Sequence, residues 1–536
     1  MGYQAHSLFV TPVASKGGSL TEGVVGIPRF INPVIAVSDV ERDLSALIYA
    51  GLMKYDNGKL VGNLAESYEI SEDGLTYTFT LKPDIKFHDK TPVTADDVEF
   101  TIQKIQDAAV KSPRRADWAD ITVNKIDATT IQFVLKQAYS PFIENTTLGI
   151  IPKHIWKNVG SEQFNFSQYN IEPIGAGPYA VDSIERDSGG LPLSYELESW
   201  NGYSDQAAYI DNLSIKFFPS SKALVEAYNE GVVESMYGVT AQDIGLIISD
   251  DDNEAQVIRS PLPILIGIFL NQNQAPVLAY KEVRQALDMA VPRERLVEEV
   301  LGGYGVIAQS PLPRTYYDRS TSTPSYDSQQ SVNNALALLE KAGWTLGPEG
   351  ILERKTKSGA TEILSFSITT TASTPGLKQA AEIVAMAWKE IGVHADVRVF
   401  DGDLSQNVIR PRKYDALLFG EVIGSDIDLY PFWHSSQRTG FGLNISQYVN
   451  SKTDKLLEDA RATSDTASRD EKYRAFEKII QEDIPAIFLY SPEFTYIVPK
   501  AVQGIELKTM TTPADRWNDI EHWYVSTDKV WNIFVK

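Results

Sequence analysis

The sequence predicts an α/β protein built from two lobes. Its 536 residues exceed what one hydrophobic core ordinarily holds, so at least two compact parts are expected. From about residue 195 onward, β-type segments alternate with amphipathic helical segments, an order typical of a largely parallel sheet. The first half contains more hairpin signals and is expected to be of the α+β kind.

The first half is predicted from turn and cap signals. Residues 1–22 are small and polar, which is typical of a tether that leads into the fold. Asn57-Gly58 and Asp73-Gly74 are two-residue hairpin turns, and apolar side chains alternate with Thr over 75–81, which predicts a strand. Thr94-Ala-Asp-Asp97 predicts the start of a helix, because Thr can accept from an early N–H and the acids lie at the positive end of the dipole.

The second half is predicted from hydrophobic periodicity and from helix breakers. Pro292 splits one helical stretch into two, and Gly343 follows another helix. The segments expected in chain order are a strand at 213–218, a helix at 221–235, two helices within 280–303, a helix at 332–344, a strand at 363–370, a helix at 376–392, strands at 395–400 and 414–422, and a helix at 468–482 followed by a buried strand.

The composition argues against several classes of function. A formal net charge of −22 without a run of Lys or Arg makes nucleic acid an unlikely partner. The absence of Cys excludes disulfides, thiolate nucleophiles and iron–sulfur clusters, and it fits an oxidising compartment. No apolar run is long enough to span a membrane, and no secretory signal is visible at the start of the chain.

Sequence motifs of enzymes are mostly missing. The six His residues form no paired ligand spacing, and there is no nucleophile elbow or phosphate-binding loop. His88 lies between a predicted strand and a predicted helix without a nearby ligand partner, so a structural role is favoured over a metal site. The glycine patterns at 175–180 and 303–308 lack the strand-then-helix context of a dinucleotide loop. We therefore expect no cofactor and no metal.

One loop, residues 424–448, combines groups that suit ligand binding. It follows a predicted strand and carries Asp426 and Asp428 together with Tyr430, Phe432 and Trp433. A carboxylate beside aromatic rings can hold an ammonium group through charge and cation–π contact, and loops at the ends of parallel strands often bind ligands. The alternative is a packed loop in which the Asp side chains cap turns.

Several blocks along the chain resemble one protein family. The sequence is similar to the extracytoplasmic solute-binding proteins of family 5, the peptide/nickel class of ABC importers, which includes oligopeptide- and dipeptide-binding proteins. The resemblance extends from about Gly23 to Tyr524, and Lys90 departs from the glycine usual in its turn. The blocks that carry it are 63–100, which matches the family signature almost residue for residue, and the shorter segments GAGPY (175–179), 269–297, AGW (342–344), YDALLFG (414–420) and 479–490.

The resemblance implies a type II periplasmic-binding-protein fold with an extra subdomain. Two lobes would be joined by two crossing strands, near 260–272 and 485–498. The implied division is a tether over 1–22, lobe I over 23–265 with the extra subdomain at about 55–175, lobe II over 266–488, and a return to lobe I over 489–536.

The resemblance also implies a set of ligand-binding residues. Asp426 matches the acid that pairs with the α-ammonium group of a bound peptide, with Asp428 as a close rival. Trp433 would wall the same pocket. Weaker candidates are Arg29, Gly175 and Ala176, which would line the cleft from lobe I, and Asn271 at the entry to lobe II.

The function implied is that of a solute receptor. Such a protein, expected as a monomer at the periplasmic or extracellular face of the cell membrane, would capture a peptide between its lobes and deliver it to a membrane permease without chemical conversion. Two alternatives stay open at this point. The cargo can be a nickel chelate, an oligosaccharide or haem, or the chain is a hydrolase whose paired acids are Asp426 and Asp428.

Overall fold

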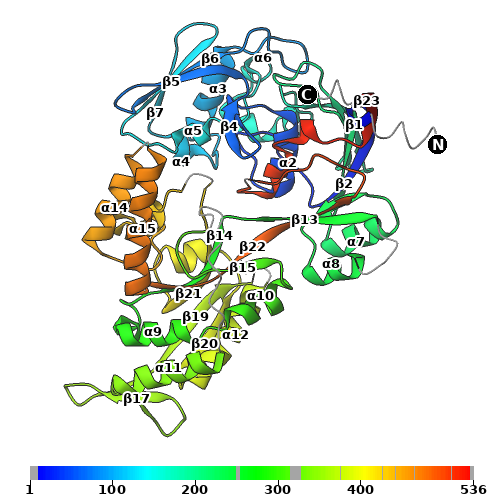
Figure 1. The fold of residues 1–536 in the computed structure, drawn as a ribbon. Helices are drawn as coiled ribbons and strands as arrows, with labels where there is room; N and C mark the ends of the chain where they lie inside the picture. Colours follow the sequence, from blue (N-terminus) through cyan, green and yellow to red (C-terminus); the bar gives the residue numbers. More distant parts are fainter. Residues whose placement is uncertain are drawn as a thin grey trace. The chain divides into compact units, whose positions relative to one another are not determined.

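The protein forms two compact units (Figure 1). The computed structural model describes residues 10–248, 254–313, 328–372, 374, 376–424, 427–440, 442–463, 465–508 and 510–531. Unit 1 consists of Met1–Ser260 and Phe494–Lys536, and unit 2 consists of Pro261–Glu493. The chain therefore leaves unit 1 once, after Ser260, and returns to it once, at Phe494.

The main sheet of unit 1 has the strand order β12-β2-β11-β10-β9. β2 runs parallel to its two neighbours β11 and β12, whereas β10 is antiparallel to β11 and to β9. The C-terminal part of β22 adds to this sheet beside β12, where Met236 pairs with Ile497. The bounds are β2 Ser19–Val25, β9 Tyr179–Arg186, β10 Pro192–Ser199, β11 Asn212–Phe218, β12 Ser235–Tyr237, β13 Ala255–Pro261 and β22 Ala486–Pro499.

The tether expected over residues 1–22 differs from the structure wherever that segment is described. β1 (Val10–Ser15) pairs antiparallel with the last described strand, β23 (Ser526–Trp531), and Val10 lies opposite Trp531. The next residues already belong to β2, where Leu20 is fully buried. The polar composition of this segment did not indicate a strand. β1 depends on a partner, β23, at the opposite end of the sequence.

A second sheet of unit 1 falls within the region expected for the extra subdomain. It has the order β5-β6-β8-β7, and the short hairpin β3–β4 precedes it. Asn57 and Gly58 both have positive φ (52° and 77°), which confirms the predicted turn. The bounds are β3 Met53–Asp56, β4 Lys59–Gly62, β5 Ala65–Ile70, β6 Thr76–Leu81, β7 Ile121–Lys125 and β8 Thr130–Leu135.

The predicted helix start at Thr94 is confirmed. The backbone N–H and the hydroxyl of Thr94 both donate to the Asp97 carboxylate (2.9 and 3.0 Å) at the beginning of α3. Asp97 also accepts from the N–H of Lys153, so it joins the start of α3 to the start of α6 (Lys153–Trp156). The helices of unit 1 are α2 Asp39–Ile48, α3 Ala95–Gln106, α4 Arg115–Trp118, α5 Phe142–Asn145, α6 Lys153–Trp156, α7 Ser221–Asn229 and α8 Ala241–Ile248.

A buried ion cluster joins β2, α2 and the C-terminal segment of unit 1. The guanidinium of Arg516 is fully buried and bonds the carboxylates of Glu22 (2.8 Å) and Asp43 (2.7 Å). The rings of Tyr237 and Trp517 lie on the guanidinium, each 4.2 Å from its carbon. Charge, hydrogen bonds and aromatic contact therefore all converge on one side chain that the sequence did not single out.

The sheet of unit 2 has the order β20-β19-β21-β14-β22 and is of mixed direction. β19 is parallel to β20 and β21, as expected, but β14 is antiparallel to β21 and to β22. The expectation of a largely parallel sheet was thus too simple, because strands that carry the chain into and out of the unit need no crossover helix. The bounds are β14 Ile264–Leu270, β15 Gly305–Ile307, β19 Ser365–Thr371, β20 His394–Phe400 and β21 Ala416–Val422.

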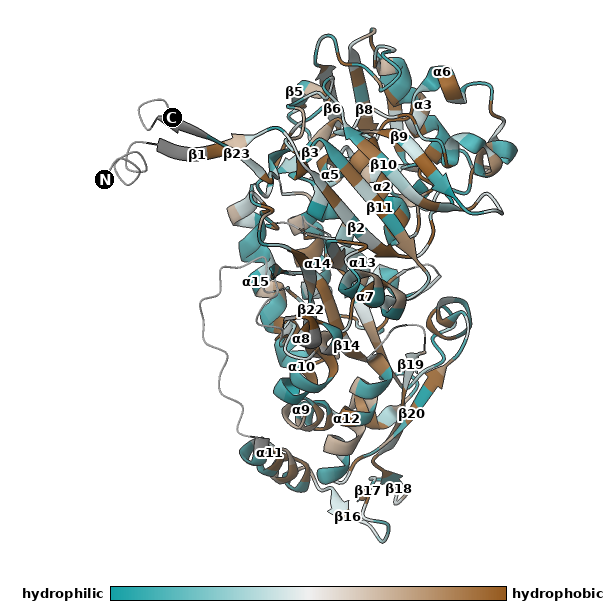
Figure 2. Cartoon of the chain, turned by 90° about the vertical axis from the view of Figure 1, so that its right-hand side faces the viewer, coloured by the Kyte–Doolittle hydropathy of each residue, from teal (hydrophilic) through white to brown (hydrophobic). Residues whose placement is uncertain are grey.

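Helices cover both faces of this sheet. Ile266 and Ile268 of β14 belong to a hydrophobic cluster with α9, α10, α11 and α12, whereas Leu265 and Phe269 belong to a second cluster with α14 and α15. Figure 2 shows the hydropathy of each residue along the strands of this sheet, from hydrophilic to hydrophobic. The helices are α9 Lys281–Met289, α10 Arg293–Leu301, α11 Ser328–Lys341, α12 Leu377–Glu390, α13 Tyr430–Trp433, α14 Ser451–Arg461 and α15 Thr466–Asp483. The split at Pro292 and the helix before Gly343 are therefore confirmed.

Candidate functional site

The loop after β21 carries the two predicted ligand-binding acids. Asp426 lies outside the described residues. Asp428 is described, and its carboxylate accepts the N–H of Tyr430 (3.2 Å) at the start of α13 and the Nε–H of Arg461 (3.1 Å) at the end of α14. Asp428 thus caps a turn and ties α13 to α14, as in the alternative that the sequence left open.

Tyr430 contacts two other side chains, His434 and Arg461 of α14. Its ring stacks on His434 with centroids 4.1 Å apart and an interplanar angle of 14°. The guanidinium carbon of Arg461 lies 4.2 Å from the same ring. Since Arg461 also bonds Asp428, the loop is fixed by a connected set of polar and aromatic contacts.

Trp433 lies in the core of unit 2. Its side chain is fully buried, and its ring centroid lies about 6 Å from those of Phe269, Phe476 and Phe488. The indole N–H has no acceptor among the residues that the structure describes. In this structure Trp433 anchors the end of α13 to the sheet.

Asn271 is also buried and has local backbone partners. Its amide nitrogen donates to the carbonyl of Arg412 (3.2 Å), and its side-chain oxygen accepts the N–H of Asn273 (3.3 Å). The N–H of Asn271 donates to the carbonyl of Asp415, whose carboxylate accepts from Ser367. Asn271 therefore closes the turn after β14 against the start of β21.

The turn that carries Arg29 is organised by one buried acid, Glu41 of α2. One carboxylate oxygen accepts the N–H groups of Arg29 (3.1 Å) and Phe30 (3.2 Å). The other oxygen accepts the N–H groups of Val37 (2.9 Å) and Ser38 (3.0 Å). Four backbone donors thus converge on Glu41, and the side chain of Arg29 remains exposed.

Gly175 and Ala176 are buried against the end of α2. The N–H of Gly177 donates to the carbonyl of Ile48 (2.8 Å), which brings the two backbones together. A Cβ built on Gly175 would lie 2.0 Å from that carbonyl oxygen. Only glycine fits there, so packing against α2 explains the first glycine of the GAGPY block.

His88 is bonded to the same segment, residues 175–177, through its backbone and its ring. Its backbone N–H donates to the carbonyl of Gly175 (2.8 Å), and its ring Nε2 lies 3.1 Å from the carbonyl oxygen of Gly177. Nδ1 lies 3.4 Å from the N–H of Gly175, an arrangement that suits a neutral ring with the proton on Nε2. Burial lowers the pKa of His88 to about 4 from the ordinary 6.5.

Acid is therefore expected to destabilise unit 1 through His88. Because the folded-state pKa lies below the unfolded value of 6.5, the unfolded chain binds more protons between pH 6.5 and about 4. The neutral His88 ring contributes fully to the free energy of unfolding above pH 6.5. This contribution falls by about 2–3 kcal/mol as the pH drops through the window to about 4. Unfolding free energies of wild type and His88→Gln, measured from about pH 7 to about pH 4, should converge toward the acid end. Parallel pH profiles of the two proteins would contradict this role.

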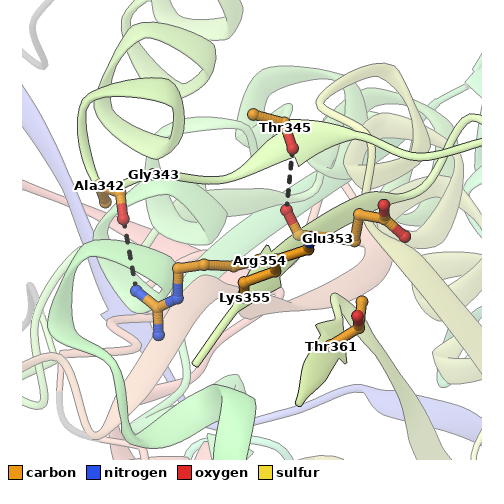
Figure 3. Close-up of a pocket in the computed structure, with 7 residues that line it drawn as sticks. All are labelled: Ala342, Gly343, Thr345, Glu353, Arg354, Lys355 and Thr361. Atoms are coloured by element: carbon orange, nitrogen blue, oxygen red, sulfur yellow. Dashed lines mark hydrogen bonds between the residues drawn. The ribbon is translucent and has the colours of Figure 1, made fainter. Parts of the chain in front are cut away.

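Figure 3 shows a pocket elsewhere in unit 2. It has a volume of about 440 Å³ and lies beside the small sheet β16 (Thr345–Leu346), β17 (Leu352–Lys355) and β18 (Thr361–Ile363). Arg354 faces Ala342 there, and its charge is balanced by Glu282 (3.2 Å) and Glu362 (3.4 Å). None of the predicted ligand-binding residues lines this pocket.

The predicted site residues fall into two groups. Arg29, Gly175 and Ala176 belong to unit 1 and flank α2, whereas Asp428, Trp433 and Asn271 belong to unit 2. The sequence reasoning missed Glu41, although its position three residues after Ser38 is the signature of a capping box, which is present. Its additional bonds to the Arg29 turn are visible only in the folded chain.

Metal-binding clusters and membrane-spanning helices would mark other classes of protein. Within the described ranges, no group of three or more His, Asp or Glu side chains is arranged to hold a metal ion. Across the same residues, none of the helices has both the length and the apolar character needed to cross a bilayer.

Comparison with known proteins gives matches along nearly the whole chain. The oligopeptide-binding protein AppA of Bacillus subtilis is 28% identical over 524 residues, which cover 95% of this chain and 92% of that protein. The dipeptide-binding protein of Pseudomonas aeruginosa is 25% identical and covers 94% of this chain and 95% of its own length.

Solved structures of such proteins have the same two-lobed fold. AppA of Bacillus subtilis in complex with a nonapeptide superposes with a TM-score of 0.71 at 27% identity, covering 96% of this chain and all of that one. The substrate-binding protein CtaP of Listeria monocytogenes gives a TM-score of 0.78 at 27% identity, covering 95% of this chain and 99% of that chain. NikZ of Campylobacter jejuni, in complex with Ni(L-His), gives 0.72 at 25% identity, covering 94% and 99%.

The family model for "Bacterial extracellular solute-binding proteins, family 5 Middle" matches residues 59–441, which is well over half of the chain. The fold class predicted from the sequence, a two-lobed periplasmic-binding-protein fold, is confirmed by these likenesses. The chain belongs to family 5 of the bacterial extracellular solute-binding proteins.

Proposed function

We propose that this chain is the extracytoplasmic solute receptor of an ABC importer and that its cargo is a peptide. The observation that carries the proposal is the end-to-end match with the oligopeptide-binding protein AppA, which covers 95% of this chain and has been solved with a bound nonapeptide. The receptor binds its cargo outside the cytoplasm, acts as a monomer, and passes the cargo to a membrane permease without converting it.

The proposed mechanism is a closure of the two units on the peptide. A ligand that contacts both units favours the closed state by its differential affinity for it. Asp426 receives the α-ammonium group of the peptide, and the Arg29 turn, Gly175 and Ala176 contribute contacts from unit 1. An extended peptide satisfies its backbone groups against these loops in the manner of a strand.

Asp428, Trp433 and Asn271 have partners within unit 2 and take no direct part in the proposed contact with the peptide. Asp428 is bonded to Arg461 and Tyr430, Trp433 is packed in the core, and Asn271 is bonded to backbone groups. We assign to Asp428 and Trp433 the positioning of the loop that carries Asp426, whereas Asn271 orders the turn at the start of β21. Glu41 has the same role for the turn that carries Arg29.

A nickel chelate is the second candidate cargo, because NikZ, whose structure contains Ni(L-His), is 25% identical over 94% of this chain. Calorimetric titration with Ni(L-His) and with pentaalanine distinguishes the two. Tight binding of the chelate together with no binding of any peptide would replace peptide by chelate in the proposal. Chromatography of the peptide after prolonged incubation tests the hydrolase alternative, and recovery of intact peptide is expected.

Asp426→Asn is expected to weaken binding of pentaalanine roughly 10- to 100-fold, since it removes a charge-assisted bond to the peptide's ammonium group. Acetylating the N-terminus of the peptide should weaken its binding to wild type by a similar factor and should matter little to Asp426→Asn. Glu349→Gln, an exposed substitution in the same unit, serves as the control. Unchanged affinity in Asp426→Asn would remove Asp426 from the site, and binding of no peptide by wild type would remove the proposed function itself.

A further inference from the structure

One buried acid of unit 2, Glu421 of β21, has no partner for its charge. The residue is only 3% exposed. Neither carboxylate oxygen has a hydrogen-bond partner among the residues that the structure describes. A buried carboxylate without a partner is costly, so its presence needs an explanation.

The other buried acids of the described chain are all bonded. Glu22 and Asp43 share Arg516, Glu41 accepts four backbone N–H groups, and Glu521 pairs with Lys54. The remaining ones are bonded as well: Asp97 to Thr94, Glu477 to Ser310 and Asp519 to the N–H of Asn57. Glu421 is thus the exception within the described part of the molecule.

The surroundings of Glu421 supply no charge. Residues two apart in a strand share a face, so Glu421 lies on the face of Leu417 and Phe419, which pack in the second hydrophobic cluster. Its cross-strand neighbour on β14 is Leu265, which is fully buried. Burial alone raises the pKa of Glu421 well above its ordinary value, and no charged side chain contributes to the shift.

The position of Glu421 in the sheet points to a ligand. It is the penultimate residue of β21 and lies at the carboxyl end of that strand, which is parallel to β19. In α/β sheets ligands bind outside the carboxyl ends of parallel strands. The loop that carries Asp426 leaves from the same end, only a few residues further along the chain.

We propose that Glu421 is a ligand-binding acid that receives a cationic side chain of the bound peptide, the ammonium group of lysine or the guanidinium of arginine. The inference rests on the proposed function and makes the substrate class narrower, namely peptides with a basic residue. A lone carboxylate suits such a group, because the N–H groups of a single cation can donate to both carboxylate oxygens. It does not suit a metal ion, which needs several further oxygen or nitrogen ligands.

Ligand binding then includes the transfer of one proton. The empty site holds the neutral acid, which is the form that an apolar environment favours. When the cation enters, the O–H bond breaks, the proton passes to solvent, and the carboxylate pairs with the cation. Binding of a basic peptide therefore releases the proton that the neutral acid carries, whereas a neutral peptide releases none at this residue.

The test uses the full chain and two sets of pentaalanine-based peptides. Each peptide of the first set carries one Lys, at positions one to five in turn, and each peptide of the second set carries Nε-acetyl-lysine at the same position. Calorimetry in buffers of different ionisation enthalpy gives both the affinity and the number of protons released. We expect at least one Lys peptide to bind wild type about tenfold or more tightly than its acetylated counterpart, with proton release.

Glu421→Gln keeps the shape of the side chain and removes its charge. In this variant we expect the Lys preference and the proton release to disappear, while the acetyl-lysine peptides bind within about threefold of wild type. Glu349→Gln, in an exposed turn, is the matched control and should keep the preference. A preference that survives in Glu421→Gln, or peptides bound by wild type with no preference for Lys, would overturn this inference alone. Failure to bind any peptide would overturn the proposed function together with it.

Discussion

Replacing Arg516 with methionine is expected to destabilise unit 1 by roughly 3–5 kcal/mol. The guanidinium makes five hydrogen bonds, two to Glu22, two to Asp43 and one to the carbonyl of Pro513, which use all of its donors. Methionine fills much of the volume but leaves two buried carboxylates without a counter-charge. Native-state hydrogen exchange of unit 1 peptides measures the loss, since the two units need not unfold in one transition.

Two further variants make the Arg516 result interpretable. Arg42→Met removes an ion pair to Asp39 in which both side chains are largely exposed (43% and 50%), so its cost should stay below about 1 kcal/mol. The triple variant Arg516→Met, Glu22→Gln, Asp43→Asn removes the unpaired charges and should recover part of the stability. A loss in Arg516→Met no larger than that of Arg42→Met would mean that the carboxylates do not depend on Arg516.

Gly175→Ala is expected to cost about 3 kcal/mol or more, the second of the large effects. The added Cβ would lie 2.0 Å from the carbonyl oxygen of Ile48, a backbone atom that cannot rotate away. Separating the two segments breaks the bond from Gly177 to Ile48 and strains the bond from His88 to Gly175, both of which are backbone bonds. Hydrogen exchange of the α2 and 173–178 segments should accelerate together.

Gly245→Ala is the control for this substitution. Gly245 lies in α8 on the exposed side, and a Cβ there meets nothing within 4 Å. Alanine is the better helix former, so this variant should be neutral or stabilising by up to about 1 kcal/mol. Equal effects of the two substitutions would show that the close approach of Gly175 to α2 is not what constrains position 175.

Local signals were enough to predict most of the elements. Asn57-Gly58 sets its hairpin, Thr94 and Asp97 start α3, and Pro292 separates α9 from α10, since each acts on its own neighbours. The pairing of β1 and the direction of β14 were not predicted. Both depend on partners far away in the sequence, about which turn and cap residues carry no information.

The candidate site could be predicted only as a region. The sequence indicated the loop after β21 because acids and aromatic residues are concentrated there. It did not show that Asp428 is bonded to Arg461, 33 residues away, or that the ring of Trp433 packs beside Phe269 of β14. Glu421 was not predicted as a site residue, because it lies within an otherwise apolar strand. An acid at a buried position of such a strand could have indicated it.

The antiparallel ribbon of β1 and β23 has a practical meaning for protein engineering. Because Val10 lies opposite Trp531, the described chain nearly closes into a ring within unit 1. A short peptide linker can join these ends, and new termini can be opened at the exposed turn around Gly190 between β9 and β10. Such a circular permutant would carry a reporter at a hairpin remote in sequence from the loops discussed above.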